Sequence, residues 1–293
     1  MKPSAFEYHR PGTVDDAVDL LSELDDAKVL AGGQSLVPLM NFRLAAPAHL
    51  IDITGVTELR HIDVIDRSDG TRGVEVGAGV THAETLDHAA AGAACPLLHQ
   101  ALALVAHAVI RNRGTVCGSL AHADPAGELP AVLALLEGHV HLASTAGRRR
   151  VDAADFFVST FESSALDHEL VTSAFFPRTD AHVGTAFVEV ARRHGDYAMC
   201  GAAATVGMDG DRVTRARLAL IAVAPTPLVI DASPVVEGLT PDDIDRAAIY
   251  RLVTDSVRPG GDLHATADYR RHLAGVLAGR AVADAVDRAG AGP

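Results

Sequence analysis

Apolar residues near the start of the chain recur first at helical and then at strand spacing. Four apolar positions between residues 17 and 24 follow the i, i+3, i+4, i+7 pattern, and Thr13 with Asp16 before them resembles a capping box. This pattern predicts a short amphipathic helix. The brief apolar run 28–31 then predicts a buried strand that meets a pair of glycines, where the chain can turn and a ligand can approach the backbone.

The middle of the chain mixes both kinds of spacing. Helices are expected from Ser35 and over 82–91, and a buried helical face that ends at Val109 leads into the segment 111–124. A further helix is expected to begin at Asp124-Pro125, because an acidic side chain suits the positive end of a helix and proline suits its first position. Strands are expected over residues 50–54, 59–66, 73–79, 139–145 and 169–177.

The pattern of apolar residues changes in the last part of the chain, where it predicts long strands followed by helices. Strands are expected over 187–193, 200–208 and 212–224, with a turn at 209–211, and the chain after Thr240 is expected to be helical. One helical face there is formed by Tyr269, Leu273, Val276 and Leu277. This change predicts a domain boundary near Pro177, with a domain of strands and then helices beyond it.

Composition excludes several classes of function. The chain has 293 residues, 48% of them hydrophobic, so it can bury a sizeable core. Its net charge of -13 argues against binding nucleic acid or an anionic membrane, and the one basic cluster, 148–150, is too short to change this. No window approaches the roughly 20 apolar residues of a membrane span, and the N-terminus lacks an apolar signal core. A cytoplasmic protein is expected.

Two small-residue segments are candidates for holding a ligand. Gly32-Gly33-Gln34-Ser35 lies between a strand and a helix, and its amides could face an anion; Thr115 to Ser119 is a second such loop, flanked by Arg111 and Arg113. Together they suit an extended phosphate-containing cofactor. The alternative is that both are ordinary turns and both arginines are surface charges, and the residues alone do not decide between the two. Neither segment is a Rossmann fingerprint or a P-loop.

Metal and thiol chemistry find little support in the sequence. Three cysteines without a CxxC spacing give neither a disulfide framework nor a four-thiolate site, so any iron–sulfur cluster must come from a partner. His139 and His141 alternate on a strand, which favours a solvated face over a metal site. His82 and Glu84 could polarise a bound ring, although Glu84 is as easily a first-turn acid.

Two long motifs resemble a known family. KVLAGGQSLVPLMNFRLAAPAHLIDI and IRNRGTVCGSLAHADPAGELPAV are similar to the two FAD-binding motifs of the medium subunit of the xanthine dehydrogenase and carbon monoxide dehydrogenase family of molybdenum hydroxylases. FEYHRPGTVDDAVDLL, RRHGDYAMCGAAATV and YRRHLAGVLAGRAV resemble other segments of that subunit. The resemblance covers nearly the full chain.

The resemblance implies an FAD site with residues from four segments. The first loop would wrap the pyrophosphate, the second would also touch FAD, Asp124 and Glu128 would reach the ribose and adenine side, and Tyr197 would lie near the isoalloxazine. The implied cofactor-binding residues are Leu30, Ala31, Gly32, Gly33, Gln34, Ser35, Leu36, Thr115, Val116, Cys117, Gly118, Ser119, Asp124, Glu128, Val171 and Tyr197. No catalytic acid or base and no metal ligand is expected among them, because FAD carries the redox chemistry.

The resemblance also implies a fold and partners. The fold class is α+β: a two-lobed FAD-binding domain of the vanillyl-alcohol-oxidase (PCMH) type over 1–177, with lobes of about 1–57 and 58–177, then an α+β CO-dehydrogenase-flavoprotein C-terminal domain over 178–293. The implied function is electron transfer to an external acceptor. A large molybdopterin subunit and a small subunit with 2Fe-2S clusters would complete a dimer of heterotrimers, a heterohexamer.

Two departures from the family pattern leave questions open. The second loop commonly reads TIGGS, and here Cys117 places a side chain where the backbone usually approaches the cofactor. We expect FAD to bind still, with the thiol turned away or resting on the cofactor. Glu189 or Val188 stands where relatives often carry a basic residue, which bears on the flavin potential. A self-sufficient FAD oxidase of the same fold and a nucleotide-sensing module are the alternative functions.

Overall fold

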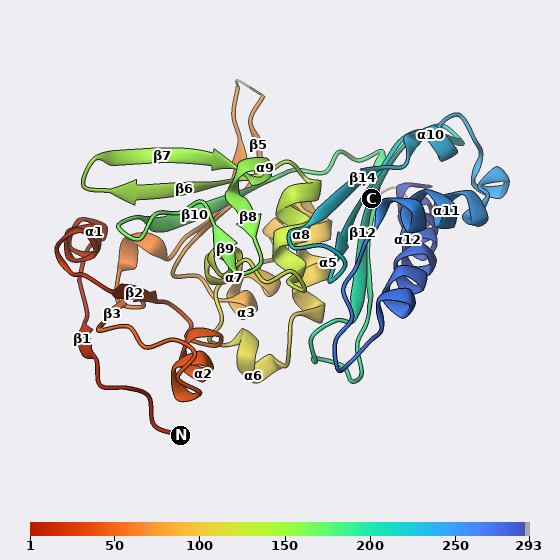
Figure 1. Ribbon diagram of the computed structural model, residues 1–293. Coiled ribbons are helices and arrows are strands. Elements are labelled where there is room, and N and C mark those ends of the chain that lie inside the picture. The colour runs from red at the N-terminus through yellow and green to blue at the C-terminus, as the bar shows by residue number, and fades with distance from the viewer. Residues whose placement is uncertain (69, 291–293) are drawn as a thin grey trace.

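The computed structural model describes residues 1–68 and 70–290, and the last three residues of the expected C-terminal domain lie outside that part (Figure 1). The described chain forms a small parallel sheet, a larger antiparallel sheet and a second antiparallel sheet near the C-terminus, with helices packed between and over them. Strands β10 and β11 are joined by the short segment 178–182, which links the two halves of the molecule.

The first lobe is built on a three-stranded parallel sheet in the order β1-β3-β2. Thr13 caps the first helix, because its hydroxyl accepts a hydrogen bond from the Asp16 N–H at 3.1 Å, and the buried side of that helix packs into the core, as its apolar spacing predicts. The elements are β1 (Glu7–His9), α1 (Val14–Glu23), β2 (Ala27–Leu30), α2 (Leu36–Asn41) and β3 (His49–Asp52).

The second lobe is a five-stranded antiparallel sheet in the order β4-β5-β10-β6-β7, with short helices on one face. Its strands are β4 (Ile62–Asp66), β5 (Arg72–Gly77), β6 (His139–Ser144), β7 (Gly147–Asp152) and β10 (Leu170–Pro177). Its other elements are η1 (Thr57–Leu59), α3 (His82–Leu86), α4 (Ala89–Ala94), α5 (Pro96–Leu104), α6 (Ala108–Arg111), α7 (Val116–His122), α8 (Glu128–Leu135), α9 (Ala153–Phe156), β8 (Phe157–Ser159) and β9 (Glu162–Ser163).

Alternation along these strands divides the five-stranded sheet into an apolar and a polar face. Val76, Val140 and Phe176 are fully buried beneath the helices, whereas their neighbours Glu75 and His141 point to the opposite side. The sheet therefore presents apolar side chains to α7, which contacts β5 and β10, and a polar surface to the other side.

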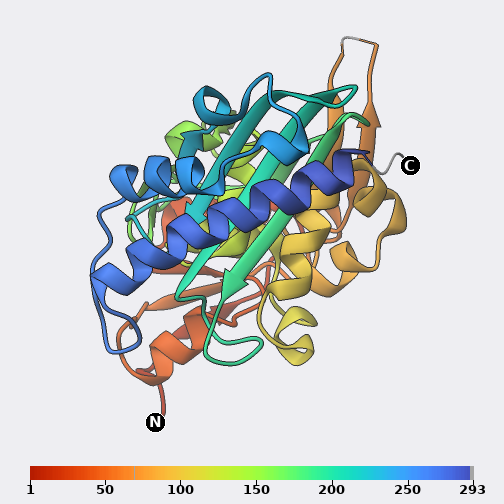
Figure 2. The ribbon, with the colours of Figure 1, turned by 90° about the vertical axis from the view of Figure 1, so that its right-hand side faces the viewer.

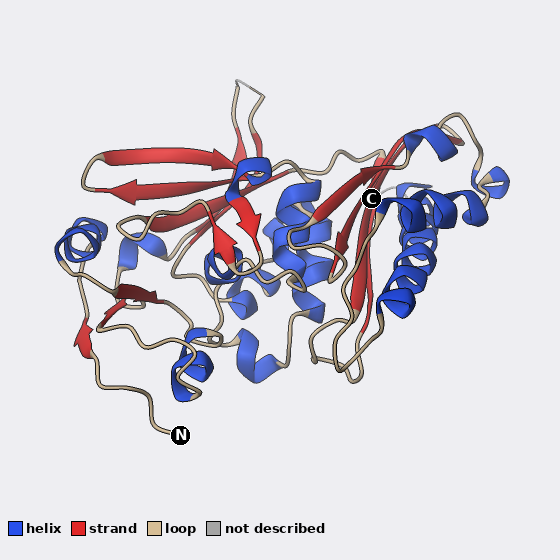
Figure 3. Ribbon diagram, in the orientation of Figure 1, coloured by secondary structure: helices blue, strands red, loops and turns tan. Residues whose placement is uncertain are grey.

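The C-terminal half is a four-stranded antiparallel sheet in the order β11-β12-β13-β14, with α12 lying diagonally across one face (Figure 2). Helices α5 and α8 of the second lobe cover its other face (Figure 3). The elements are β11 (Val183–Val190), β12 (Cys200–Asp209), β13 (Arg212–Ile221), β14 (Leu228–Asp231), α10 (Ser233–Val236), η2 (Pro241–Asp243), α11 (Arg246–Ser256) and α12 (Ala267–Gly290).

Polar contacts fasten the two halves to each other. The Ala222 N–H donates to the Pro125 carbonyl at 2.7 Å, and the Arg217 guanidinium donates to the Leu135 carbonyl at 3.1 Å. Both acceptors flank α8, so the helix that follows the second candidate loop is held against the C-terminal sheet.

Several elements differ from the sequence-based expectation. The helix expected over 82–91 is two helices, since His88 accepts a hydrogen bond from the Ala91 N–H and starts a new one. Val109 is 72% exposed, because Ala106 takes a left-handed conformation and the chain leaves the buried face before α6. The helix expected at Asp124-Pro125 begins at Glu128, after a turn closed by the Asp124 side chain.

Some strands were not expected, and the bounds of others differ from those expected. Strand β7 carries three consecutive arginines and β14 is short, so neither shows an apolar alternation of its own. The strand expected over 187–193 covers 183–190 instead, and the one expected over 212–224 ends at Ile221. On α12, Leu273 and Leu277 are buried as expected, whereas Tyr269 is exposed.

Candidate functional site

The first candidate loop follows β2 and leads into α2. Gly33 has φ +71°, a conformation that glycine adopts without strain. The Gln34 side-chain amide donates to the Gly32 carbonyl at 3.1 Å and so fixes the loop from within. Within the described residues, the backbone N–H groups of Gly32, Gly33, Gln34 and Ser35 have no hydrogen-bond acceptor. Such a run of free amides is suited to an anion.

The second candidate segment is a helix start and not a loop. Thr115 is the N-cap of α7, and its hydroxyl accepts from the Gly118 N–H at 3.0 Å. The sequence suggests a loop here because small and hydroxyl residues dominate, yet Thr, Ser and Gly are also typical of a helix N-terminus. Among the described residues, the N–H groups of Thr115 and Cys117 donate to no acceptor.

The two segments, about eighty residues apart in sequence, are in direct contact. A Cβ atom on Gly32 would lie 2.6 Å from the Gly114 Cα and closer still to the Arg113 carbonyl oxygen, so glycine is required there. The second segment is held in turn by an antiparallel bridge between Thr81 and Thr115. The two segments therefore lie side by side, as a shared ligand would require, and their joint use of one ligand stays a prediction.

His82 packs against the second segment. From the sequence it was considered only as a group that could polarise a bound ring. Its imidazole is 3% exposed, its Nε2 lies 2.9 Å from the Ser119 hydroxyl, and it occupies the space beside Gly114. Burial lowers its pKa to about 4, so it is neutral at physiological pH. The adjacent Glu84 completes a capping box with Thr81 and pairs with Arg60, which makes it a first-turn acid.

The Cys117 side chain points away from the free amides. It is 2% exposed, and its Sγ lies 3.4 Å from the Val76 carbonyl oxygen of β5, to which the thiol donates. Burial raises the pKa of the thiol well above its ordinary value, so the side chain stays protonated. Of the two orientations expected for this thiol, the structure has the one that turns it into the core.

We predict that Cys117→Gly binds FAD as tightly as the native chain but is less stable. The thiol contributes packing on β5 and nothing to the amide surface, so its removal should cost about 1–2 kcal/mol of unfolding free energy and leave the dissociation constant within about twofold. Urea unfolding and FAD titration measure the two quantities. A large loss of FAD affinity with unchanged stability would contradict this account.

Asp124 and Glu128 lie close enough to Tyr197 to act on its hydroxyl, although the family motifs assign the two acids to the ribose and adenine side of FAD and Tyr197 to the isoalloxazine. Tyr197 lies in the segment between β11 and β12 and is 71% exposed; partial desolvation of its hydroxyl and the negative charges of Asp124 and Glu128 raise its pKa. Burial, and then the charge of Glu189, raises the pKa of Glu128 to about 8. These side chains form an acidic surface where the two halves of the chain meet.

Glu189 is a further acidic residue near Glu128, and its burial was not expected from the sequence. It lies on β11, and its Oε2 is buried with no hydrogen-bond partner among the described residues. Burial raises its pKa to about 7. The sequence singles out Glu189 only as a departure from a basic residue in relatives, whereas in the structure its charge acts on Glu128 across the two halves of the chain.

The remaining expected residues have different surroundings. Val171 lies on β10 opposite Leu142 and is 8% exposed, so its side chain belongs to the core. Arg111 donates to the Val105 and Ala106 carbonyls at 2.8 Å and so holds its own turn. Cys95 and Cys200 are free and buried.

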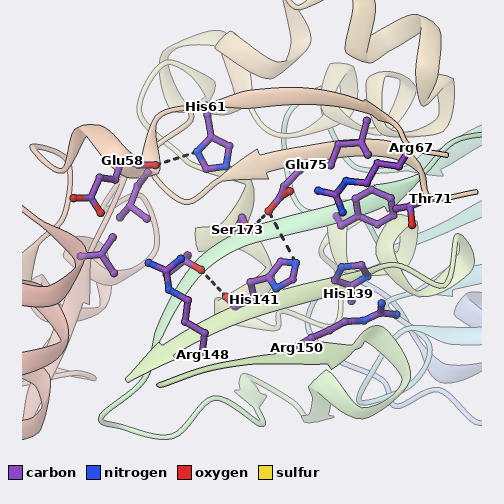
Figure 4. Close-up of a pocket in the computed structure, with 15 residues that line it drawn as sticks. Glu58, His61, Arg67, Thr71, Glu75, His139, His141, Arg148, Arg150 and Ser173 are labelled. Carbon is purple, nitrogen blue, oxygen red and sulfur yellow. Dashed lines mark hydrogen bonds and ion pairs between the residues drawn. The ribbon is translucent and has the colours of Figure 1, made fainter. Parts of the chain in front are cut away.

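A cavity of about 560 Å³ lies elsewhere, on the polar face of the five-stranded sheet (Figure 4). His139 and His141 line it together with Glu75, which lies 4.0 Å from His141. His139 is buried and stacks on Phe175, so the expectation of a solvated histidine face is wrong for this residue. None of the expected FAD-binding residues lines this cavity.

Comparison with known proteins identifies the class. The family model "FAD binding domain in molybdopterin dehydrogenase" matches residues 4–179, and "CO dehydrogenase flavoprotein C-terminal domain" matches residues 185–285. The chain therefore belongs to the family of FAD-binding medium subunits of molybdenum hydroxylases, which are oxidoreductases with FAD as the cofactor of this subunit. The family and the fold class expected from the sequence are confirmed.

Individual relatives agree over the whole chain. The 6-hydroxypseudooxynicotine dehydrogenase complex subunit alpha of Paenarthrobacter nicotinovorans is 39% identical over 292 residues, 99% of this chain and 97% of the relative. The carbon monoxide dehydrogenase medium chain of Hydrogenophaga pseudoflava is 36% identical over 96% of this chain and 97% of its own length.

Solved structures have the same fold. A carbon monoxide dehydrogenase from Hydrogenophaga pseudoflava matches with a TM-score of 0.91 at 36% identity, covering 98% of this chain and 99% of that chain. Quinoline 2-oxidoreductase from Pseudomonas putida 86 matches with a TM-score of 0.90 at 36% identity, covering 99% of both. Across the described residues, no helix has the length and apolar character needed to span a membrane.

Proposed function

We propose that this chain is the FAD-carrying electron-transfer subunit of a heteromeric molybdenum hydroxylase. It receives electrons from the 2Fe-2S clusters of a small partner and passes them to an external acceptor. The observation that carries the proposal is the contact of Gly32 with Gly114, which brings two segments with free backbone amides side by side, as one anion-binding surface would require. One such surface with two cradles suits the pyrophosphate of FAD.

Each part of the site has a separate task in this proposal. The amides from Gly32 to Ser35 and at the start of α7 bind the pyrophosphate, and neutral His82 fixes the Ser119 hydroxyl without adding charge. Asp124 and Glu128 accept hydrogen bonds from the ribose and adenine side. When bound, FAD supplies both one-electron and two-electron chemistry, which suits an exchange between iron–sulfur clusters and an acceptor.

The residues proposed to hold FAD are those expected from the family motifs. They are Leu30, Ala31, Gly32, Gly33, Gln34, Ser35, Leu36, Thr115, Val116, Cys117, Gly118, Ser119, Asp124, Glu128, Val171 and Tyr197. Exposure of Tyr197 leaves its ring accessible to an isoalloxazine. Cys117 and Val171 would contribute backbone atoms, since the side chains of both lie in the core. Domains of 1–177 and 178–293 are part of the same proposal.

The proposed partners are a large molybdopterin subunit and a small iron–sulfur subunit, arranged as a cytoplasmic dimer of heterotrimers. Relatives bear names such as medium chain, medium subunit and complex subunit, which supports an assembly of several chains. Those names mention substrates as different as caffeine, nicotine and carbon monoxide. The substrate of the present complex is therefore expected to be set by the large subunit.

Purification of the tagged chain from its own cells tests the proposal. We expect two further chains in stoichiometric amounts, one with molybdopterin and one with 2Fe-2S clusters, and a native mass of a heterohexamer. Turnover of a substrate by the isolated yellow chain would instead indicate a self-sufficient oxidase. A chain that binds FAD neither in the cell nor after reconstitution would indicate the nucleotide-sensing alternative.

A further inference from the structure

Two histidines and a glutamate converge on one point of the first-lobe sheet, away from every residue of the FAD proposal. The His9 Nε2 lies 3.1 Å from the His49 Nδ1, and the Glu7 Oε2 lies 3.7 Å from the same nitrogen. All three ligand atoms lie within 4.8 Å of one another, and within the described residues this is the one cluster of three His, Cys, Asp or Glu side chains with that property.

The backbone brings these side chains together. Glu7 and His9 are two residues apart on β1 and therefore share a face of the strand, while Tyr8 between them points to the other face and bonds to Asp52. The parallel register places Glu7 opposite His49 on β3. The cluster is thus built on paired strands, which hold ligands more rigidly than a loop does.

We propose that Glu7, His9 and His49 form a binding site for a divalent transition-metal ion such as Zn²⁺. With metal–ligand bonds of about 2.0–2.1 Å, the ligand atoms of a tetrahedral site are about 3.4 Å apart. The two short separations here, 3.1 and 3.7 Å, lie on either side of that value. In the structure the two imidazoles share a hydrogen bond, so an ion would take the place of the proton between them.

The chemistry of the three ligands selects the kind of ion. Two imidazoles with one carboxylate suit Zn²⁺, Ni²⁺ or Cu²⁺, whereas Mg²⁺ and Ca²⁺ prefer oxygen ligands alone. The His49 side chain is 20% exposed and that of Glu7 is 74% exposed, so an ion can enter from solvent. Three protein ligands leave a fourth position for water.

The position of the cluster points to a role separate from the flavin. His49 pairs with Ala27 at the beginning of β2, whereas the glycine segment follows Leu30 at the other end of that strand. The site would join β1, a three-residue edge strand, to the central strand β3. An ion bound only by the folded chain stabilises it, so metal should raise the unfolding temperature without changing FAD content.

Titration of the EDTA-treated full chain with Co²⁺ and then Zn²⁺ tests this site. We expect one Co²⁺ per chain with the visible absorption of a four-coordinate ion, its displacement by Zn²⁺, and a higher unfolding temperature with either ion. His9→Ala and His49→Ala should each weaken binding by about a hundredfold or more, because losing even a second-shell partner costs roughly 10–100-fold. FAD content should not change.

His264→Ala is the matched control, since it removes an exposed histidine outside the cluster. It should bind Co²⁺ as the native chain does. Glu7→Gln removes a ligand from an exposed position, so it tests the site even where a histidine variant fails to fold. The proposal is overturned by a native chain that binds neither ion, or by binding that is unchanged in Glu7→Gln and in every folded histidine variant.

Discussion

Gly32→Ala is expected to bind FAD about a hundredfold more weakly than the native chain. A methyl group at this position would meet the Gly114 Cα at 2.6 Å and the Arg113 carbonyl, both of them backbone atoms that no side-chain rotation can move. The two amide-bearing segments would have to separate, and overpacking of this kind costs about 1–3 kcal/mol, where each 1.4 kcal/mol is a tenfold change in affinity. Fluorescence titration of the FAD-free chain measures the effect.

Gly260→Ala provides the control for this substitution. A Cβ atom on Gly260 would meet nothing within 4 Å, and its backbone lies outside the left-handed region. This variant should retain native affinity and stability. An FAD affinity in Gly32→Ala equal to that of the native chain would show that the two segments do not form a joint binding surface.

Stability is expected to fall as the pH rises through 7 and 8, because of Glu128 and Glu189. Burial raises their pKa values from 4.5 to about 8 and about 7, so the folded chain holds these protons more tightly than the unfolded chain does. Both carboxyls are protonated in the folded chain at low pH, and the folded chain becomes less stable as they lose these protons on raising the pH. We expect the loss to begin above about pH 4.5, the ordinary pKa of a glutamate, and to be complete at about pH 8, with a total on the order of 2–4 kcal/mol.

Glu128→Gln and Glu189→Gln test this directly, since glutamine is a neutral replacement of the same shape. Each variant should have a flatter profile of unfolding temperature against pH and should be more stable than the native chain at high pH. Glu237→Gln, at an exposed position, should keep the native profile. A native profile in both buried-acid variants would refute the assignment of the pH dependence to these two side chains.

The family and the cofactor segments could be predicted from the sequence because their signals are local. The glycine pair after β2 and the hydroxyl-rich stretch before α8 can each be recognised within a short window of sequence. The sequence around them also resembles the family over most of the chain. Their direct contact could not be predicted, since the space around Gly32 depends on the backbone at 113–114. The second segment was read as a loop because capping residues occur in turns as well.

The side-chain clusters that depend on long-range packing could not be predicted from the sequence. Glu7 and His9 lie 40 or more residues from His49, and nothing in their spacing indicates a common site before the parallel register is known. Glu128 and Glu189 are brought near each other by the packing of the two halves of the chain, so their raised pKa values have no local signature. For the same reason, the alternation of His139 and His141 suggested a solvated strand, while the structure buries His139 against Phe175.

Anaerobic mixing with the reduced iron–sulfur partner tests the central claim most directly. The FAD-loaded chain is combined with its small 2Fe-2S subunit, previously reduced with dithionite and freed of excess reductant, and the flavin absorbance is followed. The account predicts that the flavin is bleached as the clusters are reoxidised, and that FAD-depleted Gly32→Ala chain leaves the clusters reduced. A native flavin that stays oxidised beside reduced clusters would contradict it.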